Sequence, residues 1–259
     1  MPTLAVHLAV VAEAAAIIGD ETLSNHQGDL FLGSTCPDIR NLIGVPREAT
    51  HYVSLGDTSG ACGIGCFLEA HQAATEFSLL SGAAKCFVAG YLSHLVTDAT
   101  WIAEIYRPFF GKSSALADLR ERDMLDRALQ FDLEQRERRQ LGRFEAICAL
   151  IAGAEGFANL GVADDDVLRR WRGFICGALD LEDVAQRFRY FARSFAREGQ
   201  MIPVNRSEGF VQGFPALLAR ALQHVPEGSI ASFRQKSIDA TVEVIREFLS
   251  ADFQSLLKR

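Results

Sequence analysis

The most apolar long segment of this chain is AAKCFVAGYLSHLVTDATWIAEIY, residues 83–106. Ser81-Gly82 breaks the helical pattern just before it, and Pro108 with Gly111 ends it, because proline cannot continue a helix and glycine weakens one. A helix that is apolar on nearly all of its faces must be surrounded by other helices. We therefore predict an all-α protein, built as a helical bundle around a buried central helix.

Long helical patterns with short breaks also dominate the rest of the sequence, and the alternating patterns of strands are scarce. Residues 27–61 are the exception, because their many Gly, Pro, Asp, Ser and Thr residues indicate an irregular segment with short helical turns. No linker divides the chain, so residues 1–259 are predicted to form a single domain. Its candidate metal site falls in the half at about 1–135, and about 136–259 completes the bundle. The further helices are expected at 4–19, 62–80, 115–136, 139–155, 165–178, 181–198, 212–224 and 230–256.

Charge and hydropathy narrow the classes of function. The net charge of −7 argues against a stable nucleic-acid complex, because proteins that bind the phosphate backbone usually carry a basic patch. The apolar stretch at residues 1–20 has no basic region before it and is interrupted by His7, Glu13 and Asp20. We expect it to form a buried helix rather than a signal or transmembrane segment, and the protein to be cytoplasmic. The oligomeric state is left open by the sequence.

The central helix carries two residues that are costly to bury. His94 and Asp98 are four positions apart, so both side chains project from the same face of the helix. An imidazole and a carboxylate in apolar surroundings need partners, and a zinc ion suits both of them. A hydrogen-bonded His–Asp pair that joins two helices is an equally good explanation, and this segment alone does not decide between them.

Three residues outside this helix favour a metal. Asp38 closes the predicted turn GSTCPD, residues 33–38, in which we expect Pro37 to keep the preceding residue extended and the glycine to let the backbone approach closely. His51 follows in a stretch rich in Gly and Thr, and His7 lies on the first predicted helix. Taken alone, Asp38 is an ordinary turn aspartate and His7 an ordinary core histidine. Together with the pair on the central helix they form a candidate ligand set.

The order His…Pro-Asp…His…His-x-x-x-Asp resembles the zinc-dependent phospholipase C family, whose α-helical fold is shared with the S1/P1 nucleases. The resemblance covers about residues 1–110, and its most specific parts are residues 33–38 and 89–101. It implies a phospholipase C/P1 nuclease-like bundle that holds one to three zinc ions, with Asp38 as general base. The ligands that it implies are His7, Asp38, His51, His94 and Asp98.

The chain departs from that family at several ligand positions. The secreted enzymes use an N-terminal Trp, a histidine shortly after the helix pair and a His-x-x-x-Glu on the next helix. Here no histidine lies between His94 and His224. Glu104, Asp123 or Asp126 would complete the site instead, and such carboxylates would shift its preference from zinc towards manganese or iron.

The activity that the resemblance implies is metal-dependent hydrolysis of a small-molecule or lipid phosphoester, with a metal-activated water as the nucleophile. The missing ligands keep a second hypothesis open, that of a non-catalytic metal-binding or structural helical protein that retains the fold. A third interpretation, an HD-type phosphohydrolase, is weaker because the chain has no adjacent His-Asp pair.

Overall fold

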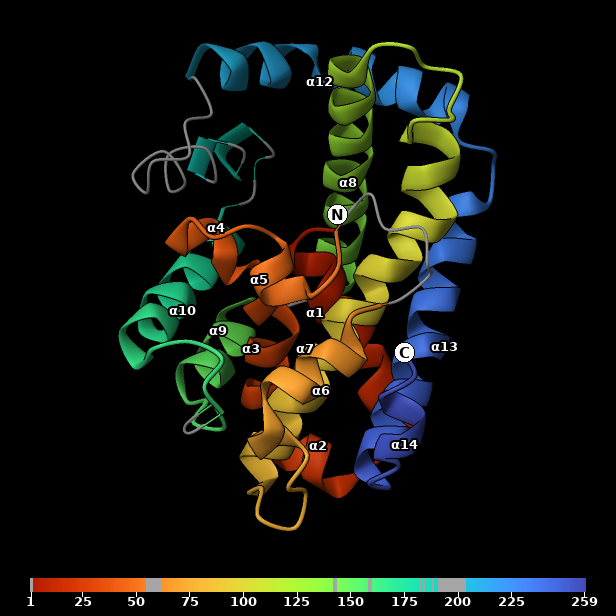
Figure 1. Ribbon diagram of the computed structural model, residues 1–259. Coiled ribbons are helices and arrows are strands. Elements are labelled where there is room, and N and C mark those ends of the chain that lie inside the picture. The colour runs from red at the N-terminus through yellow and green to blue at the C-terminus, as the bar shows by residue number, and fades with distance from the viewer. Residues whose placement is uncertain are drawn as a thin grey trace.

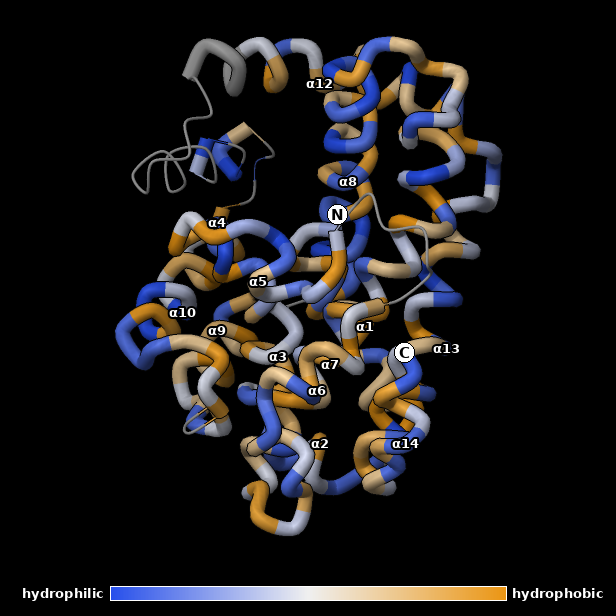
Figure 2. Tube along the Cα trace, in the orientation of Figure 1, coloured by the Kyte–Doolittle hydropathy of each residue, from blue (hydrophilic) through white to orange (hydrophobic). Residues whose placement is uncertain are grey.

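All regular secondary structure that the structure describes is helical (Figure 1). No strand occurs among the described residues, so the all-α prediction is confirmed. The outer helices α8 and α13 alternate between hydrophobic and hydrophilic positions along their length, as helices that cover a core do (Figure 2). The computed structural model describes residues 2–54, 62–141, 144–157, 160–181, 183, 185–187, 189–190 and 204–259.

The helices differ widely in length, and a π-helix, η3, directly continues α7. Short 3-10 helices are labelled η1 and η2. In chain order the elements are α1 (Leu4–Ile18), α2 (Glu21–Asn25), α3 (Gln27–Thr35), η1 (Cys36–Ile39), α4 (Arg40–Ile43), α5 (Glu48–His51), α6 (Ile64–Ala70), η2 (Gln72–Ala74), α7 (Gly82–Trp101), η3 (Ile102–Phe110), α8 (Leu119–Leu141), α9 (Phe144–Ala152), α10 (Asp165–Leu179), α12 (Val204–His224), α13 (Ser229–Leu249) and α14 (Phe253–Leu256).

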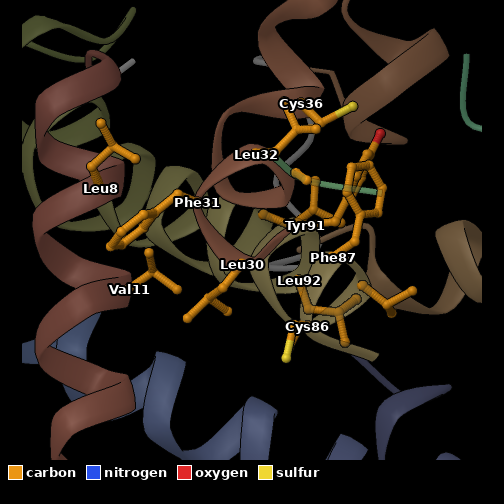
Figure 3. Packing of buried hydrophobic residues seen from close by; sticks show 14 of the residues in the cluster. Leu8, Val11, Leu30, Phe31, Leu32, Cys36, Cys86, Phe87, Tyr91 and Leu92 are labelled. Atoms are coloured by element: carbon orange, nitrogen blue, oxygen red, sulfur yellow. The ribbon is translucent and has the colours of Figure 1, made fainter. Parts of the chain in front are cut away.

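Helix α7 is the buried central helix that the sequence predicts. The Ser81 hydroxyl caps its first turn by accepting a hydrogen bond from the Ala84 N–H at 3.1 Å. Every residue from Cys86 to Asp98 is buried, and α7 packs against α1, α3 and α13. Around it, apolar side chains interdigitate: in Figure 3, Phe31 of α3 points towards Leu8 of α1.

Helices α3 and α7 touch through two glycines. A Cβ atom at Gly33 would overlap the carbonyl oxygen of Phe87, and one at Gly90 would overlap that of Leu30. Glycine at these positions therefore lets the two backbones meet. The crossing places the end of α3, and η1 after it, against the middle of α7, where His94 lies.

The segment at 27–61, predicted to be irregular, begins with the nine-residue helix α3. Cys36, expected to be extended before Pro37, is helical at φ −61° and ψ −37°, because α3 continues directly into η1. Gly28 and Gly33 lie at close contacts between helices, as the sequence analysis expects of Gly33. A Cβ atom at Gly28 would overlap the carbonyl oxygen of Leu150 on α9. The prediction was wrong here because tertiary packing, rather than local propensity, requires these glycines.

The helix predicted at 62–80 is α-helical only over α6, after which η2 and turns follow. The chain leaves the helix at His71, whose ring makes two tertiary hydrogen bonds. Its Nε2 lies 2.7 Å from the hydroxyl of Tyr52, and its Nδ1 lies 3.1 Å from the carbonyl oxygen of Leu160. These contacts with distant residues account for the early end of the helix.

The C-terminal helices are close to those predicted. The helix expected at 230–256 is interrupted between α13 and α14, where Ala251 takes a left-handed φ of 59°. The helix expected at 212–224 begins earlier, at Val204, and most of the one expected at 181–198 lies outside the described residues. Among the described residues, no helix is both long enough and apolar enough to cross a membrane.

Candidate metal centre

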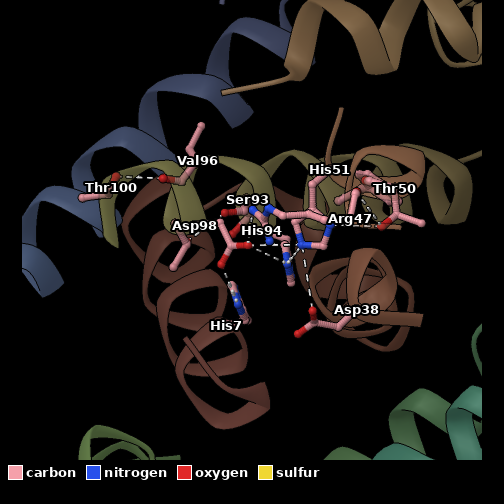
Figure 4. A network of polar contacts seen from close by, with 12 residues as sticks. His7, Asp38, Arg47, Thr50, His51, Ser93, His94, Val96, Asp98 and Thr100 are labelled. Atoms are coloured by element: carbon pink, nitrogen blue, oxygen red, sulfur yellow. Dashed lines mark hydrogen bonds and ion pairs between the residues drawn. The ribbon is translucent and has the colours of Figure 1, made fainter. Parts of the chain in front are cut away.

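Five side chains that could bind a metal converge in the interior beside α7 (Figure 4). Helix α7 supplies two of them, and α1, η1 and α5 supply one each. Four are at most 1% exposed, whereas the carboxylate from η1 keeps 17% of its surface exposed. These five are the ones grouped by the sequence pattern: His7, Asp38, His51, His94 and Asp98.

Three donor atoms form a triangle of the size that a tetrahedral metal requires. His94 Nε2 lies 3.2 Å from His51 Nε2, and Asp98 Oδ2 lies 3.2 Å from His51 Nε2 and 3.5 Å from His94 Nε2. Ligand atoms bound at about 2.0–2.1 Å in a tetrahedron are separated by about 3.3–3.4 Å. Asp38 Oδ1, 3.9 Å from His51 Nε2, adds a carboxylate on the more exposed side.

The backbone determines which nitrogen of His94 faces this triangle. His94 Nδ1 lies 2.8 Å from the carbonyl oxygen of Ser34, and a carbonyl oxygen only accepts, so Nδ1 carries the hydrogen. In the neutral ring, Nε2 is then a bare acceptor. Metal-binding histidines are commonly oriented by such a hydrogen bond from the other ring nitrogen to a carbonyl oxygen.

His51 directs a second nitrogen into the same space. Its Nδ1 lies 3.0 Å from the hydroxyl of Thr50. With the hydrogen on Nδ1, the Nε2 atoms of His51 and His94 face each other as two lone pairs, which only a cation between them would stabilise. With the hydrogen on Nε2, His51 would donate to Asp98 or His94 and need no cation. A metal ion and a hydrogen bond are thus the two ways of satisfying this pair.

His7 is the member of the cluster with the fewest polar partners. It is fully buried, and its ring stacks on that of His94 with a centroid separation of 3.7 Å and an interplanar angle of 10°. Neither ring nitrogen of His7 has a hydrogen-bond partner, and Asp98 Oδ1, 3.5 Å from His7 Nε2, also lacks one. Because unpaired buried polar atoms are costly, this part of the cluster fits a cation better than an empty interior.

The donors fall into two groups of three whose ligand atoms lie within 4.8 Å of one another. One group is His7, His94 and Asp98, and the other is Asp38, His51 and His94. Both need His94, which has only Nε2 to offer because its Nδ1 is bonded to a carbonyl oxygen. The five donors therefore suffice for one ion, whereas a second would be left with two of them.

Arg47 also belongs to the cluster, and the sequence analysis did not identify it. Its NH2 donates to Asp98 Oδ2 at 2.8 Å, and only 8% of the residue is exposed. The His51 N–H donates to the Arg47 carbonyl oxygen at 2.8 Å, so a single helical turn carries both side chains to the site. The four-residue spacing from Arg47 to His51 was visible in the sequence, but an arginine in a presumed loop gives no sign of burial.

Burial and neighbouring charges set the ionisation of these groups. Burial is the main cause that lowers the pKa of His51 to about 4, and it also lowers the pKa of His7. Burial acts to raise the pKa of Asp98, but Arg47 and the adjacent histidines outweigh it and hold that pKa well below its usual range. The pKa of Asp38 is lowered in the same way against the effect of burial. Neutral imidazoles and ionised carboxylates are the forms that bind metals.

Glu104 lies apart from the cluster and forms an ion pair. Its Oε2 is 2.7 Å from Lys236 Nζ, and about a third of its side chain is exposed. Glu104 belongs to the π-helical η3, whose wider turns move its residues off the α-helical register of His94. The structure does not bring Glu104 to the other five donors.

Asp123 and Asp126 of α8 also lie outside the donor groups. Asp123 is exposed, and the partial burial of its carboxyl group raises its pKa. Asp126 is buried and accepts hydrogen bonds from Trp101 Nε1 at 3.0 Å and from Gln130 Nε2 at 2.6 Å. Both carboxylate oxygens of Asp126 therefore have partners within the protein.

The chain matches no family model, no curated protein and no solved structure. The resemblance to the zinc-dependent phospholipase C family stays a prediction from the residue pattern. A possible metal centre rests on the geometry of the described residues, whose imidazoles and carboxylates suit zinc, manganese or iron.

Proposed function

We propose that this chain binds one divalent metal ion at the five-residue cluster and uses it to hydrolyse a phosphoester. The observation that carries the proposal is the convergence of five ligand groups whose donor atoms are spaced as around a metal, with His7 and one oxygen of Asp98 left without hydrogen-bond partners. The His94 ring carries its hydrogen on Nδ1, which leaves Nε2 as an acceptor. Neither nitrogen of His7 has a hydrogen-bond partner, and Asp98 Oδ1 lacks one too. Zinc fits the spacing of the donors, and manganese or iron fits their carboxylates.

The five donors would hold the metal, which would supply a water of lowered pKa and polarise a phosphoryl oxygen. The Ser34 carbonyl oxygen holds His94 in one orientation, and Asp98 brings a permanently ionised carboxylate into the apolar interior. The buried side chains of α7 exclude bulk water from the inner side of the centre.

Asp38 is the residue suited to meet the substrate and its water. It is the most exposed of the five donors, at 17%, and its lowered pKa keeps it ionised at neutral pH. An ionised carboxylate at the open edge can orient a water molecule and accept its proton. The substrate class, a small-molecule or lipid phosphoester, comes from the family resemblance.

A second function is favoured by one observation. The ion pair between Arg47 and Asp98 partly satisfies the buried carboxylate without a metal. A non-catalytic helical protein that keeps this network for its structure, or binds a metal only structurally, is the alternative.

The test is turnover of phosphomonoester and phosphodiester panels by protein reconstituted with zinc, manganese or iron, beside an Asp38→Asn variant. We expect the parent to hydrolyse at least one class, and the variant to keep the metal and lose activity by about 100-fold or more. Metal binding without turnover on either panel would favour the alternative, a non-catalytic metal-binding protein. Equal turnover by parent and variant would remove Asp38 from the mechanism.

A further inference from the structure

Arg47 has more hydrogen-bonding capacity than the protein uses. Its guanidinium offers five N–H donors, and the contact with Asp98 engages NH2 alone. Its Nε and NH1 are buried and have no hydrogen-bond partner, and the residue as a whole is only 8% exposed. Leaving a charged donor unpaired in the interior is costly, so this side chain is poised for an additional acceptor.

We propose that Arg47 is an anion-binding residue of the metal centre, and that it binds the phosphate oxygens of the substrate through an edge of its guanidinium that Asp98 leaves free. This inference rests on the proposed function and names the group that recognises the substrate's charge. Guanidinium groups suit phosphate because two adjacent N–H groups on one edge match two oxygens at once, and each such edge joins NH2 either to Nε or to NH1. The contact through NH2 to Asp98 would hold the fork in place beside the metal-binding residues.

The charge of the centre supports an anionic ligand. Two carboxylates, Asp38 and Asp98, are accompanied by two arginines, since Arg47 pairs with Asp98 and Arg40 lies near Asp38. A divalent cation would add two positive charges to this group. Phosphate should therefore bind the metal-loaded protein more tightly than the metal-free protein, even though the chain as a whole is acidic.

The position of Arg47 is compatible with approach from solvent. Asp38 marks the most exposed edge of the donor set, and Arg40, two residues further along, lies close enough to help lower its pKa. Arg47 precedes α5, and its sequence neighbours Pro46 and Glu48 are exposed. The segment that carries Arg47 therefore lies between the buried donors and the surface, and it would have to shift for an anion to reach the guanidinium, whose Nε and NH1 are covered by protein atoms.

The experiment is calorimetric titration of inorganic phosphate into metal-loaded parent protein and into Arg47→Met. Metal occupancy is measured on the same samples by mass spectrometry. We expect phosphate to bind the parent and to bind Arg47→Met about 10- to 100-fold more weakly, the effect of losing charge-assisted hydrogen bonds. Metal affinity should stay equal or rise in the variant, because a positive charge beside Asp98 has been removed.

Two further variants separate this role from a structural one. Arg47→Lys keeps the positive charge but lacks the fork, so it should fold like the parent and still bind phosphate several-fold more weakly. It decides the question if Arg47→Met does not fold. Arg169→Met removes an arginine whose side chain is 67% exposed on α10 and should change nothing.

Equal phosphate affinity in the parent and in folded Arg47 variants would overturn the inference and identify Arg47 as a counter-ion only. Loss of metal from Arg47→Lys would also overturn it, since the residue would then be required to build the site. A parent that takes up no metal defeats the proposed function itself, and the inference with it. A parent that takes up metal but binds no phosphate defeats the inference alone.

Discussion

Among the described residues, two of the buried polar networks are satisfied in different ways. The first is the candidate metal centre between α1, η1, α5 and α7. The second runs along α8, where every fourth residue is polar and buried. Its members are Arg122, Asp126, Gln130, Glu134 and Arg138.

Along α8, each carboxylate faces at least one donor, although Gln130 Oε1 and Glu134 Oε2 have no hydrogen-bond partner. Asp126 accepts from Trp101 and Gln130, and Glu134 Oε1 lies 3.3 Å from Arg187 Nε. Arg122 NH1 donates to the carbonyl oxygen of Gly111 at 2.7 Å. Most of the charge in this network is therefore neutralised by the protein itself, as expected of a structural network.

In the metal centre, three imidazoles and two carboxylates meet the single guanidinium of Arg47. The Nε2 atoms of His51 and His94 face each other at 3.2 Å, and His7 has no hydrogen-bond partner for either nitrogen. The comparison teaches that burial of polar groups does not by itself indicate a ligand site. The balance of donors and acceptors does, because an excess of acceptors calls for a cation.

The largest expected effect is loss of metal from a His94→Ala, Asp98→Ala double variant. It removes the shared histidine and the central carboxylate, so metal content should fall from stoichiometric to none. Glu134→Gln is the matched control, because it neutralises a buried carboxylate of the α8 network and should leave the metal in place. Mass spectrometry of untagged protein measures both, with circular dichroism to verify folding. A parent without metal after reconstitution would show that both networks are structural.

The next largest effect is expected for Gly33→Ala at the crossing of α3 and α7. The added Cβ overlaps a backbone carbonyl, so we expect a loss of roughly 1–3 kcal/mol or more in the free energy of unfolding. The substitution also displaces the adjacent Ser34 carbonyl oxygen that orients His94, so metal affinity should fall too.

Gly173→Ala is the control for this substitution. Gly173 lies in α10 with open space around its missing Cβ, and alanine there should stabilise by up to about 1 kcal/mol. Urea unfolding of both variants measures the difference. A Gly33→Ala protein as stable as the parent would mean that α3 and α7 do not cross at this distance.

A smaller effect is expected for Asp126→Asn in the α8 network. Burial raises the pKa of Asp126, so the folded chain binds its proton more tightly than the unfolded chain does. That stabilisation is present below the unfolded pKa and is lost as the pH rises through the folded pKa. Asparagine does not titrate and can still accept a hydrogen bond from Trp101.

The variant should therefore stay within about 1 kcal/mol of the parent at neutral pH. Its free energy of unfolding should increase relative to that of the parent as the pH rises from about 4 to 7. Urea unfolding at several pH values measures this difference. If the parent instead becomes more stable relative to the variant over the same pH range, the raised pKa of Asp126 is contradicted.

The smallest effect is expected for Glu104→Gln, which tests the border of the metal centre. Glu104 forms a partly exposed ion pair with Lys236, so stability should change by no more than about 0.5 kcal/mol. Metal content should not change. A drop in metal content would return Glu104 to the ligand set that the sequence suggested.

Periodicity and hydropathy were enough to predict the all-α class and the central helix. A segment apolar on nearly all faces can only be buried, and α7 is buried without interruption from Cys86 to Asp98. The glycine content of residues 27–61 was misleading over α3, where Gly28 and Gly33 permit contacts between helices and do not interrupt the helix. Local signals also failed after α6, where His71 bonds to residues far along the chain.

The sequence by itself determined the five principal candidate ligands, because imidazole and carboxylate side chains in an apolar context are few and their pattern resembles a known ligand order. Only the tertiary structure decided which of the other candidates join them. Glu104 pairs with Lys236 and Asp126 accepts a hydrogen bond from Trp101, whereas Arg47, which the sequence analysis did not identify, contacts Asp98 in the cluster. The physical reason is that a carboxylate or guanidinium pairs with whichever charge the fold brings within reach, and contacts between distant segments are not encoded in the spacing along one helix.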